Sequence, residues 1–224
     1  IAAGFWLTDQ SALADWTDRA FGPRKYYLIS LVIVLYALLP FFMAFEGRKP
    51  EVRELVVLAT MIALATAGRA AFFMTPSFKP IIAIVIISAI AFGAEAGFLV
   101  GSMTMLVSNF LFGQGPWTPW QMFAMGFIGF LSGILYRLRI LPTKRLQLSV
   151  YGFLVTFMIY GGIMNPAALF MSVYQFSWSG LLAIYISGVP VDLVHASSTF
   201  LFLWIGAKPL LEKLQRIKVK YGLL

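Results

Sequence analysis

This sequence contains no cysteine, and among its 224 residues it has one histidine, His195. Without cysteine the chain can form neither a disulfide nor a thiolate metal site. Asp192 lies three residues before His195, so both could reach one metal ion from one helix face, but no third ligand and no HExxH pattern accompany them. A polar pair that joins two helices is the other interpretation. The sequence also lacks a GxxxxGK[ST] phosphate loop, which excludes the usual P-loop hydrolysis of ATP by this chain.

Charged residues are scarce as well. They make up 12% of the chain, against 60% hydrophobic residues, and the mean hydropathy is +0.86. These values are typical of a polytopic membrane protein and exclude an ordinary soluble domain. The formal net charge of +8 would suit nucleic acid, but Lys and Arg gather at the ends of apolar segments, as membrane orientation requires. We therefore expect an all-α, polytopic transmembrane helical bundle in a lipid bilayer, without a nucleic-acid partner.

The apolar stretch 80–112 must break somewhere, because its 33 residues exceed the length of one crossing. One crossing takes about 20 residues and two take about 40. The stretch has a single carboxylate, Glu95, between Gly93 and Gly97. A charge in the middle of a bilayer costs at least about 2.5 kcal/mol on insertion scales. The sequence thus predicts a tight turn at Gly93, which brings Glu95 to the membrane surface and separates a short crossing, 80–92, from a second, 96–112.

The number of crossings is seven with a turn at Gly93 and six without it. Basic residues would divide 12 inside to 4 outside with seven crossings, and 13 to 3 with six, so the positive-inside rule does not decide. The length of 80–112 and Glu95 favour seven, with a cytoplasmic C-terminus. The sixth span should end at Asn165-Pro166. The predicted spans are 26–45, 55–73, 80–92, 96–112, 120–136, 146–164 and 180–204.

The densest motif, FGQGPWTPWQM at 112–122, gives a family resemblance. With Lys79, Pro80, Gly93, Ala96, Gly97, 108–110 and Gly126 it forms a pattern that resembles substrate-binding S components of energy-coupling-factor (ECF) vitamin transporters. Within that group the sequence is most similar to members assigned to cobalamin, and the resemblance covers about 55–204. It implies four parts: a polar lead-in at 1–25, an extra transmembrane helix and charged linker at 26–54, the S-component core at 55–206 and a basic cytoplasmic tail at 207–224.

The resemblance also implies a function and partners. An S component is not an enzyme and holds no cofactor of its own. It captures a vitamin, here expected to be cobalamin, on the outer side of the bacterial cell membrane. An ECF transmembrane coupling subunit and two ABC-type ATPases supply the energy for uptake.

Small residues predict two close-packing helix faces. Ala59, Ala63 and Ala67 recur every fourth residue on span 55–73, and Gly126, Gly129 and Gly133 share span 120–136. Such spacing lets helices approach closely in lipid. From the spacing alone, the alanine stripe could pack inside the bundle or contact a partner. In S components the corresponding stripe meets the coupling subunit.

Uncharged polar and aromatic residues gather in the three outer connections, 75–79, 113–119 and 165–179, and just inside the adjoining helices. A concave site lined by rings with a few placed amides suits a large neutral ligand. Two cations are further candidates: Lys79 is in the first outer connection, and Arg69 either extends to the interface or contacts ligand. The predicted ligand-binding residues are Asn109, Gln114, Trp117, Trp120, Gln121, Asn165, Tyr174, Gln175, Lys79 and Arg69.

Three alternatives remain at this point. The first is an S component for another vitamin or vitamin-like compound, such as a queuosine precursor, pantothenate or riboflavin. The second is an intramembrane enzyme that uses Glu95 or the pair Asp192 and His195. The third is a scaffold subunit without a ligand.

Overall fold

The computed structural model describes residues 25–141, 143–172 and 176–222, with no side-chain account of residues 25–27. All regular structure in these ranges is helical, so the expected all-α bundle is confirmed. The elements are α3 (Lys25–Gly47), α4 (Val52–Ala71), α5 (Ile81–Phe92), α6 (Ala94–Phe112), α7 (Thr118–Arg137), α8 (Arg145–Val155), the π-helical turn η2 (Thr156–Tyr160), α9 (Gly161–Ser172) and α10 (Trp178–Tyr221).

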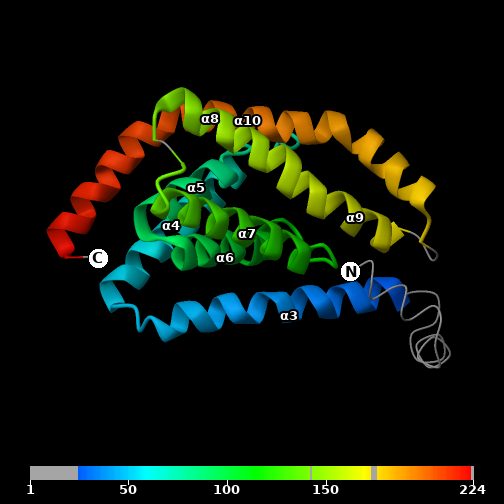
Figure 1. The fold of residues 1–224 in the computed structure, drawn as a ribbon, viewed down its shortest axis with the longest axis horizontal. Helices are drawn as coiled ribbons and strands as arrows, with labels where there is room; N and C mark the ends of the chain where they lie inside the picture. Colours follow the sequence, from blue (N-terminus) through cyan, green and yellow to red (C-terminus); the bar gives the residue numbers. More distant parts are fainter. Residues whose placement is uncertain (1–24, 142, 173–175, 223–224) are drawn as a thin grey trace.

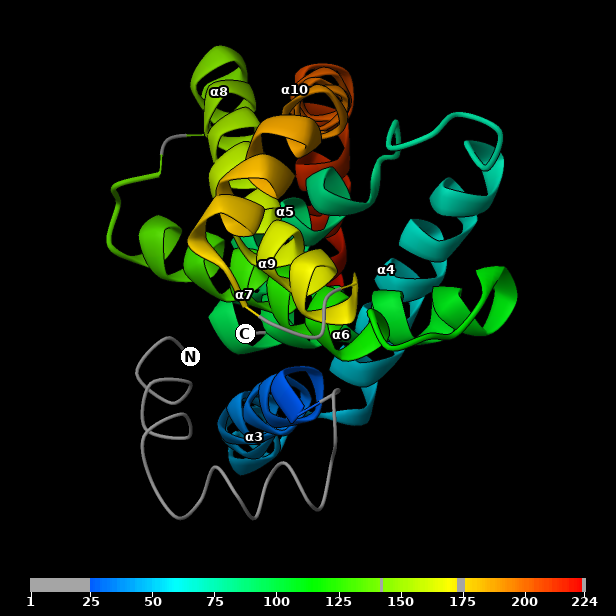
Figure 2. The ribbon, with the colours of Figure 1, turned by 90° about the vertical axis from the view of Figure 1, so that its right-hand side faces the viewer.

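Six helical stretches in the described chain are long and apolar enough to cross a membrane, which makes this a multi-pass membrane protein. One of them is the continuous run of α8, η2 and α9. Helices α3, α6 and α7 run side by side along the long axis of the molecule (Figure 1). Seen from the end of the bundle, α6 and α7 lie between α3 on one side and α8 and α10 on the other (Figure 2).

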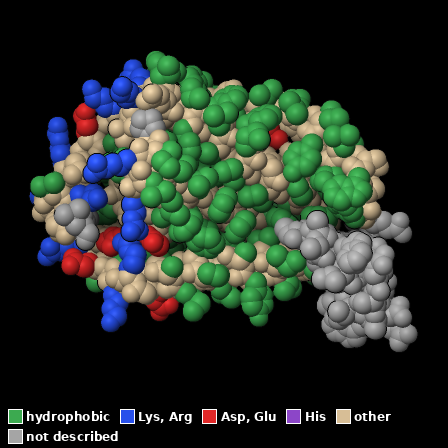
Figure 3. All heavy atoms as spheres, in the orientation of Figure 1, with side chains coloured by type: hydrophobic (Ala, Val, Ile, Leu, Met, Phe, Trp, Pro, Cys, Tyr) green, Lys and Arg blue, Asp and Glu red, His purple; other side chains and the backbone are tan. Residues whose placement is uncertain are grey.

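The charged side chains gather at one end of the bundle, the end that holds the C-terminus and the α3–α4 linker (Figure 3). We call it the charged end. On the face that Figure 3 shows, hydrophobic side chains cover much of the surface between the two ends, as contact with lipid requires. The cations and carboxylates of the charged end are Glu46, Arg48, Lys49, Glu51, Arg53, Glu54, Glu95, Arg137, Arg139, Lys144, Arg145, Lys208, Glu212, Lys213, Arg216, Lys218 and Lys220.

Helix α5 is the centre of the bundle, and all 12 of its residues are buried. At 1.5 Å per residue it is about 18 Å long, too short to cross the roughly 30 Å apolar layer alone. It ends at Gly93, whose φ of +97° favours glycine, and α6 begins at the next residue. The turn predicted at Gly93 is therefore confirmed.

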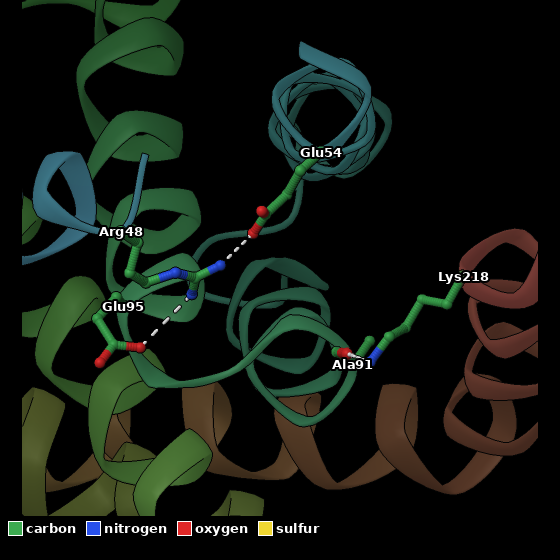
Figure 4. Close-up of polar contacts among 5 residues, drawn as sticks. All are labelled: Arg48, Glu54, Ala91, Glu95 and Lys218. Atoms are coloured by element: carbon green, nitrogen blue, oxygen red, sulfur yellow. Dashed lines mark hydrogen bonds and ion pairs between the residues drawn. The ribbon is translucent and has the colours of Figure 1, made fainter. Parts of the chain in front are cut away.

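Glu95 follows that turn at the charged end, where Arg48 lies between Glu95 and Glu54 (Figure 4). The distance from Arg48 Nη1 to Glu95 Oε2 is 3.6 Å, and the second guanidinium nitrogen donates to Glu54. The carboxylate thus avoids the apolar layer, as the sequence predicted. Because Arg48 belongs to the linker after α3, the contact also fastens that linker to α4 and α6.

Helices α6 and α7 approach so closely that glycine is required between them. A Cβ on Gly101 would lie 2.4 Å from the backbone oxygen of Met125, and one on Gly129 would lie 2.2 Å from that of Gly97. Neither backbone can move aside without separating the helices. The close-packing face predicted from Gly126, Gly129 and Gly133 is confirmed, and its partner is α6.

The chain does not leave the helix at Asn165-Pro166, so that prediction is wrong. Pro166 lies inside α9, which continues to Ser172. Proline lacks an N–H, which leaves the carbonyl of Gly162, four residues earlier, without its helical donor. The hydroxyl of Tyr185 on α10 donates to that carbonyl at 2.9 Å. A hydrogen bond from a neighbouring helix therefore replaces the one that proline removes.

The last span is also longer than predicted. Helix α10 does not end near Trp204 but runs 44 residues to Tyr221, so the basic segment after 206 is part of the same helix. It is joined to both ends of α5: Ser198 Oγ donates to the Lys79 carbonyl at 2.9 Å, and Lys218 Nζ donates to the Ala91 carbonyl at 2.6 Å (Figure 4). The two bonds fix the position of the buried helix along the bundle.

Helix α3 packs on the face formed by α6, α7 and α9. The ring of Phe41 stacks on Phe98 with centroids 4.1 Å apart and meets Phe130 edge to face at 4.8 Å. Val34 and Leu38 are buried in the same contact. The first helix is thus an integral part of the bundle, in contact with three core helices.

Candidate functional site

Arg69, near the end of α4, points into the bundle. Its Nη1 donates to Ser108 Oγ at 2.6 Å and to Asn109 Oδ1 at 2.7 Å, both on α6. The guanidinium also lies over the ring of Phe112, 5.2 Å from its centroid. Polar partners on the neighbouring helix thus satisfy the charge of Arg69.

Asn109 is fully buried and joins α6 to α7. Its Nδ2 donates to Thr118 Oγ1 and to Gln121 Oε1, each at 2.9 Å. Thr118 in turn donates to Gln114 Oε1 at 2.8 Å. The motif FGQGPWTPWQM thus folds back on the end of α6, and Thr118, which the sequence analysis did not select, lies at its centre.

The two tryptophans of this motif make other contacts than these amides do. Trp120 is 2% exposed and packs on Phe170 of α9, with ring centroids 6.2 Å apart, in a cluster that includes Val34. Its Nε1 has no hydrogen-bond partner among the described residues. Trp117 is 38% exposed and covers Gly115. The structure therefore brings together Asn109, Gln114 and Gln121 but not the indoles.

A second polar group lies between α9 and α10. Asn165 Nδ2 donates to Asp192 Oδ2 at 2.7 Å. Glycines make room for the pair: a Cβ on Gly161 would lie 2.7 Å from Asp192 Oδ2, and one on Gly188 would lie 2.5 Å from Asn165 Oδ1. In the described residues no three potential metal ligands come together. Asp192 therefore joins two helices, as one of the two sequence interpretations predicted.

Tyr160 lies between the two polar groups. Its ring meets the His195 imidazole edge to face, with centroids 4.8 Å apart. Its hydroxyl lies beside Gln121 and close enough to both Arg69 and Asp192 to interact electrostatically. It is the last residue of the π-helical turn η2, an insertion that frequently marks a functional site. Sequence reasoning missed Tyr160 because no residue pattern announces a π turn.

These side chains form one polar interior among otherwise apolar helices, in the half of the bundle away from the charged end. They come from α4, α6, α7, η2, α9 and α10 and combine a cation, a carboxylate, amides, a phenol and an imidazole. We call this set the polar core. Its members are Arg69, Ser108, Asn109, Thr118, Gln121, Tyr160, Asn165, Asp192 and His195.

Lys79 holds the connection between α4 and α5. Its Nζ donates to the carbonyl of Phe72 at 2.7 Å and to that of Thr75 at 3.0 Å. Burial lowers the pKa of Lys79 from its ordinary value, and the nearby charge of Arg69 lowers it further. Two carbonyls of the turn that follows α4 thus share the ammonium group. The remaining predicted ligand residues, Tyr174 and Gln175, lie outside the described residues.

The alanine stripe faces outward. Ala59, Ala63 and Ala67 are exposed, whereas Leu58 and Met61 on the same helix are buried. Packing of the stripe inside the bundle is therefore excluded. Beside it lies an open apolar groove of about 430 Å³ between α4, α5 and α10, lined by Leu64, Ala67, Gly68, Ala71, Pro80, Ala83, Ile84, Ile87, Phe202, Gly206 and Leu210.

In a comparison with family models, residues 49–216, more than half of the chain, match "ECF-type riboflavin transporter, S component". The matched range contains the alanine stripe and the whole polar core. It begins after α3. No curated protein and no solved structure matches the chain.

Proposed function

Since this chain belongs to the family of ECF-type riboflavin transporter S components, we propose that it captures a vitamin on the outer side of the bacterial cell membrane for uptake driven by partner subunits. The observation that carries the proposal is the polar core. Polar side chains in a transmembrane bundle are costly and are usually retained for function. Here six separate elements contribute to two hydrogen-bonded groups, with Tyr160 and its ring contact to His195 between them.

The distribution of charge supports the orientation. Twelve of the 17 Lys and Arg residues belong to the charged end, and cytoplasmic segments carry the excess of basic residues. The C-terminus is then cytoplasmic. The polar core lies in the opposite half, which is then the outer half.

The chemistry of the polar core favours a neutral ligand. A vitamin with a free carboxylate, such as pantothenate, needs a cation in the site. The two candidates are already engaged, Arg69 with Ser108 and Asn109, and Lys79 with two backbone carbonyls. Amides, a phenol and an imidazole instead offer donors and acceptors to the edge of a neutral ring system.

Riboflavin is the first candidate vitamin. It is a neutral ring system with donors and acceptors at its edge, which match the amides, the phenol and the imidazole of the polar core. The family match points the same way. Cobalamin is the second candidate because its amide-edged corrin would suit the amides of Asn109, Gln114 and Gln121, but it requires the bundle to open much further.

The transmembrane coupling subunit is the proposed partner for the exposed alanine face, with two ABC-type ATPases beneath it. Small residues on a lipid-facing surface let a partner helix approach closely. The groove that begins at Ala67 extends this surface toward α5 and α10.

Ligand titration of the detergent-purified chain tests the proposal. Riboflavin fluorescence should be quenched on binding, and Gln121→Leu should weaken binding about tenfold or more because a buried hydrogen-bonding group is lost. The control is Gln215→Leu, on the exposed surface of α10, which should bind as the wild type does. The comparison requires that both variants have the same thermal unfolding midpoint as the wild type.

Other outcomes decide between the alternatives. Binding of cobalamin and not riboflavin would reverse the order of the two candidates. Absence of binding for every vitamin tested would contradict the substrate-binding role and favour a scaffold. An intramembrane enzyme would show turnover that Asp192→Asn abolishes without loss of binding.

A further inference from the structure

Helix α10 is longer than a membrane crossing requires. Its 44 residues extend about 66 Å, against an apolar layer of roughly 30 Å. Pro209 lies inside the helix, and proline is a common cause of bending. In Figure 1 the final part, coloured red, turns away from the direction of the preceding part and runs across the charged end. We call residues 208–221 the end segment.

Most of the apolar side chains of the end segment pack inside the protein, while Val219 and Tyr221 are exposed. Leu214 is buried, and Leu210, Leu211 and Ile217 pack against the main hydrophobic cluster. Two further bonds hold the segment down. Lys218 Nζ donates to the Ala91 carbonyl at the end of α5, and the Arg53 guanidinium donates to the Tyr221 carbonyl at 3.5 Å.

The opposite face of the end segment is basic and exposed. Lys208, Lys213, Arg216 and Lys220 all face solvent, with one carboxylate, Glu212, among them. In the described part of the chain none of these four cations takes part in an ion pair. Lys213, Arg216 and Lys220 are three and four residues apart, so they share one side of the helix.

The level of this basic face matches that of phospholipid headgroups. It lies where the hydrophobic flank of the molecule gives way to charged side chains (Figure 3). Cations next to a bilayer are attracted to anionic headgroups, and this attraction falls off within a Debye length. An ordinary interfacial helix also inserts its apolar face into the lipid. Most of the apolar side chains of the end segment cannot do so, because they already pack on the bundle, which leaves Val219 and Tyr221 exposed.

We propose that the end segment is a binding surface for anionic phospholipid headgroups, held there by charge alone. The inference does not rest on which vitamin the protein takes, nor on which leaflet the charged end faces. Its physical signature is specific: preference for anionic over zwitterionic lipid should be strong at low salt and vanish at high salt.

Electron spin resonance of spin-labelled lipids tests this in membranes that contain the full chain. The relative association of labelled phosphatidylglycerol over labelled phosphatidylcholine is measured in a phosphatidylcholine host. The test variant combines Lys213→Gln, Arg216→Gln and Lys220→Gln. The control combines Arg137→Gln, Arg139→Gln and Lys144→Gln, which removes the same charge from the same end but from the α7–α8 region.

We expect the wild type and the control to prefer phosphatidylglycerol over phosphatidylcholine. In the test variant the relative association of phosphatidylglycerol should be about tenfold lower. High salt should lower that of the wild type in the same way. Equal loss in the control would overturn the proposal, because any cation at this end would then suffice. Full preference in the test variant would overturn it too. Unchanged lipid preference together with lost assembly with partner subunits would assign the surface to an acidic protein instead. Thermal unfolding of both variants checks that they are folded.

Discussion

Asn109 is the residue at which the hydrogen bonds of the polar core meet. It accepts from Arg69 and donates to Thr118 and Gln121, so a single buried side chain joins α4, α6 and α7. Arg69 and Asn109 are 40 residues apart in sequence. Without Asn109, Arg69 would keep only its bond to Ser108, and Thr118 would keep only its bonds to Gln114 and Gly115. A polar group left short of partners inside a low-dielectric interior is costly.

Replacement of Asn109 by leucine should therefore destabilise the protein. Leucine has a similar volume but leaves Arg69, Thr118 and Gln121 short of partners. We expect a loss of about 2–4 kcal/mol, from one to three unsatisfied groups at about 1–3 kcal/mol each. Thermal unfolding in detergent measures the loss, with the exposed Gln215→Leu as the control. A midpoint equal to that of the control would show that the network adds no stability.

At the scale of helices, the bundle depends on helices that pack backbone to backbone and on hydrogen bonds from one helix that replace those missing in another. Glycine lets α6 and α7 touch through their backbones, and Tyr185 repairs the hydrogen bond that Pro166 removes from α9. In both cases the contact with a neighbouring helix, and not the sequence of the helix itself, determines the structure.

Gly101→Ala should separate α6 from α7. The added Cβ would lie 2.4 Å from the backbone oxygen of Met125, and backbone cannot rotate aside as a side chain can. Overpacking of this kind costs typically about 1–3 kcal/mol. Gly206→Ala is the matched control, because nothing lies within 4 Å of a Cβ built there. The thermal midpoints of both variants decide the matter, and equal midpoints would contradict the proposed contact.

Tyr185→Phe should cost about 1 kcal/mol, the usual value of one hydrogen bond. The loss should disappear in a chain that also carries Pro166→Ala, because alanine restores the N–H that bonds to Gly162 within the helix. A double-mutant cycle of unfolding midpoints measures the coupling. An equal effect of Tyr185→Phe in both backgrounds would show that Tyr185 does not replace the hydrogen bond that Pro166 removes. Tyr136→Phe, at an exposed position, serves as the control.

At the scale of the whole molecule, the polar core and the alanine stripe occupy different surfaces. The polar core lies inside the bundle, whereas Ala59, Ala63 and Ala67 lie outside it on α4. Binding and coupling can therefore be changed separately. Leu58 and Met61 keep α4 on the bundle whatever covers its outer face.

Ala63→Leu should leave vitamin affinity unchanged and abolish assembly with the coupling subunit. The branched side chain projects from an exposed position, so it disturbs no internal packing but keeps a partner helix at a distance. Titration of the isolated chain and assembly in proteoliposomes measure the two properties, with the exposed Ala183→Leu on α10 as the control. Loss of both vitamin affinity and assembly, or normal assembly, would contradict a role of this face in contact with the coupling subunit.

The sequence by itself determined the membrane class, the turn at Gly93, the small-residue faces and the family. Composition, the length of 80–112, regular spacing and a motif of consecutive residues are all local properties of the chain, so they can be read without a structure. The position of Glu95 at the charged end follows from the same local reasoning, because a carboxylate is too costly in the apolar layer.

Only the tertiary structure decided where the interior polar groups find their partners. Arg69 turned inward because Ser108 and Asn109 lie opposite it, and Lys218 reaches a carbonyl 127 residues away. Pro166 stayed inside a helix because Tyr185 of another helix donates to Gly162, and Tyr160 joined the site through a π turn. Each is a contact between segments distant in sequence. In lipid every polar group needs a partner from the protein, so such contacts determine which predictions from local sequence are correct.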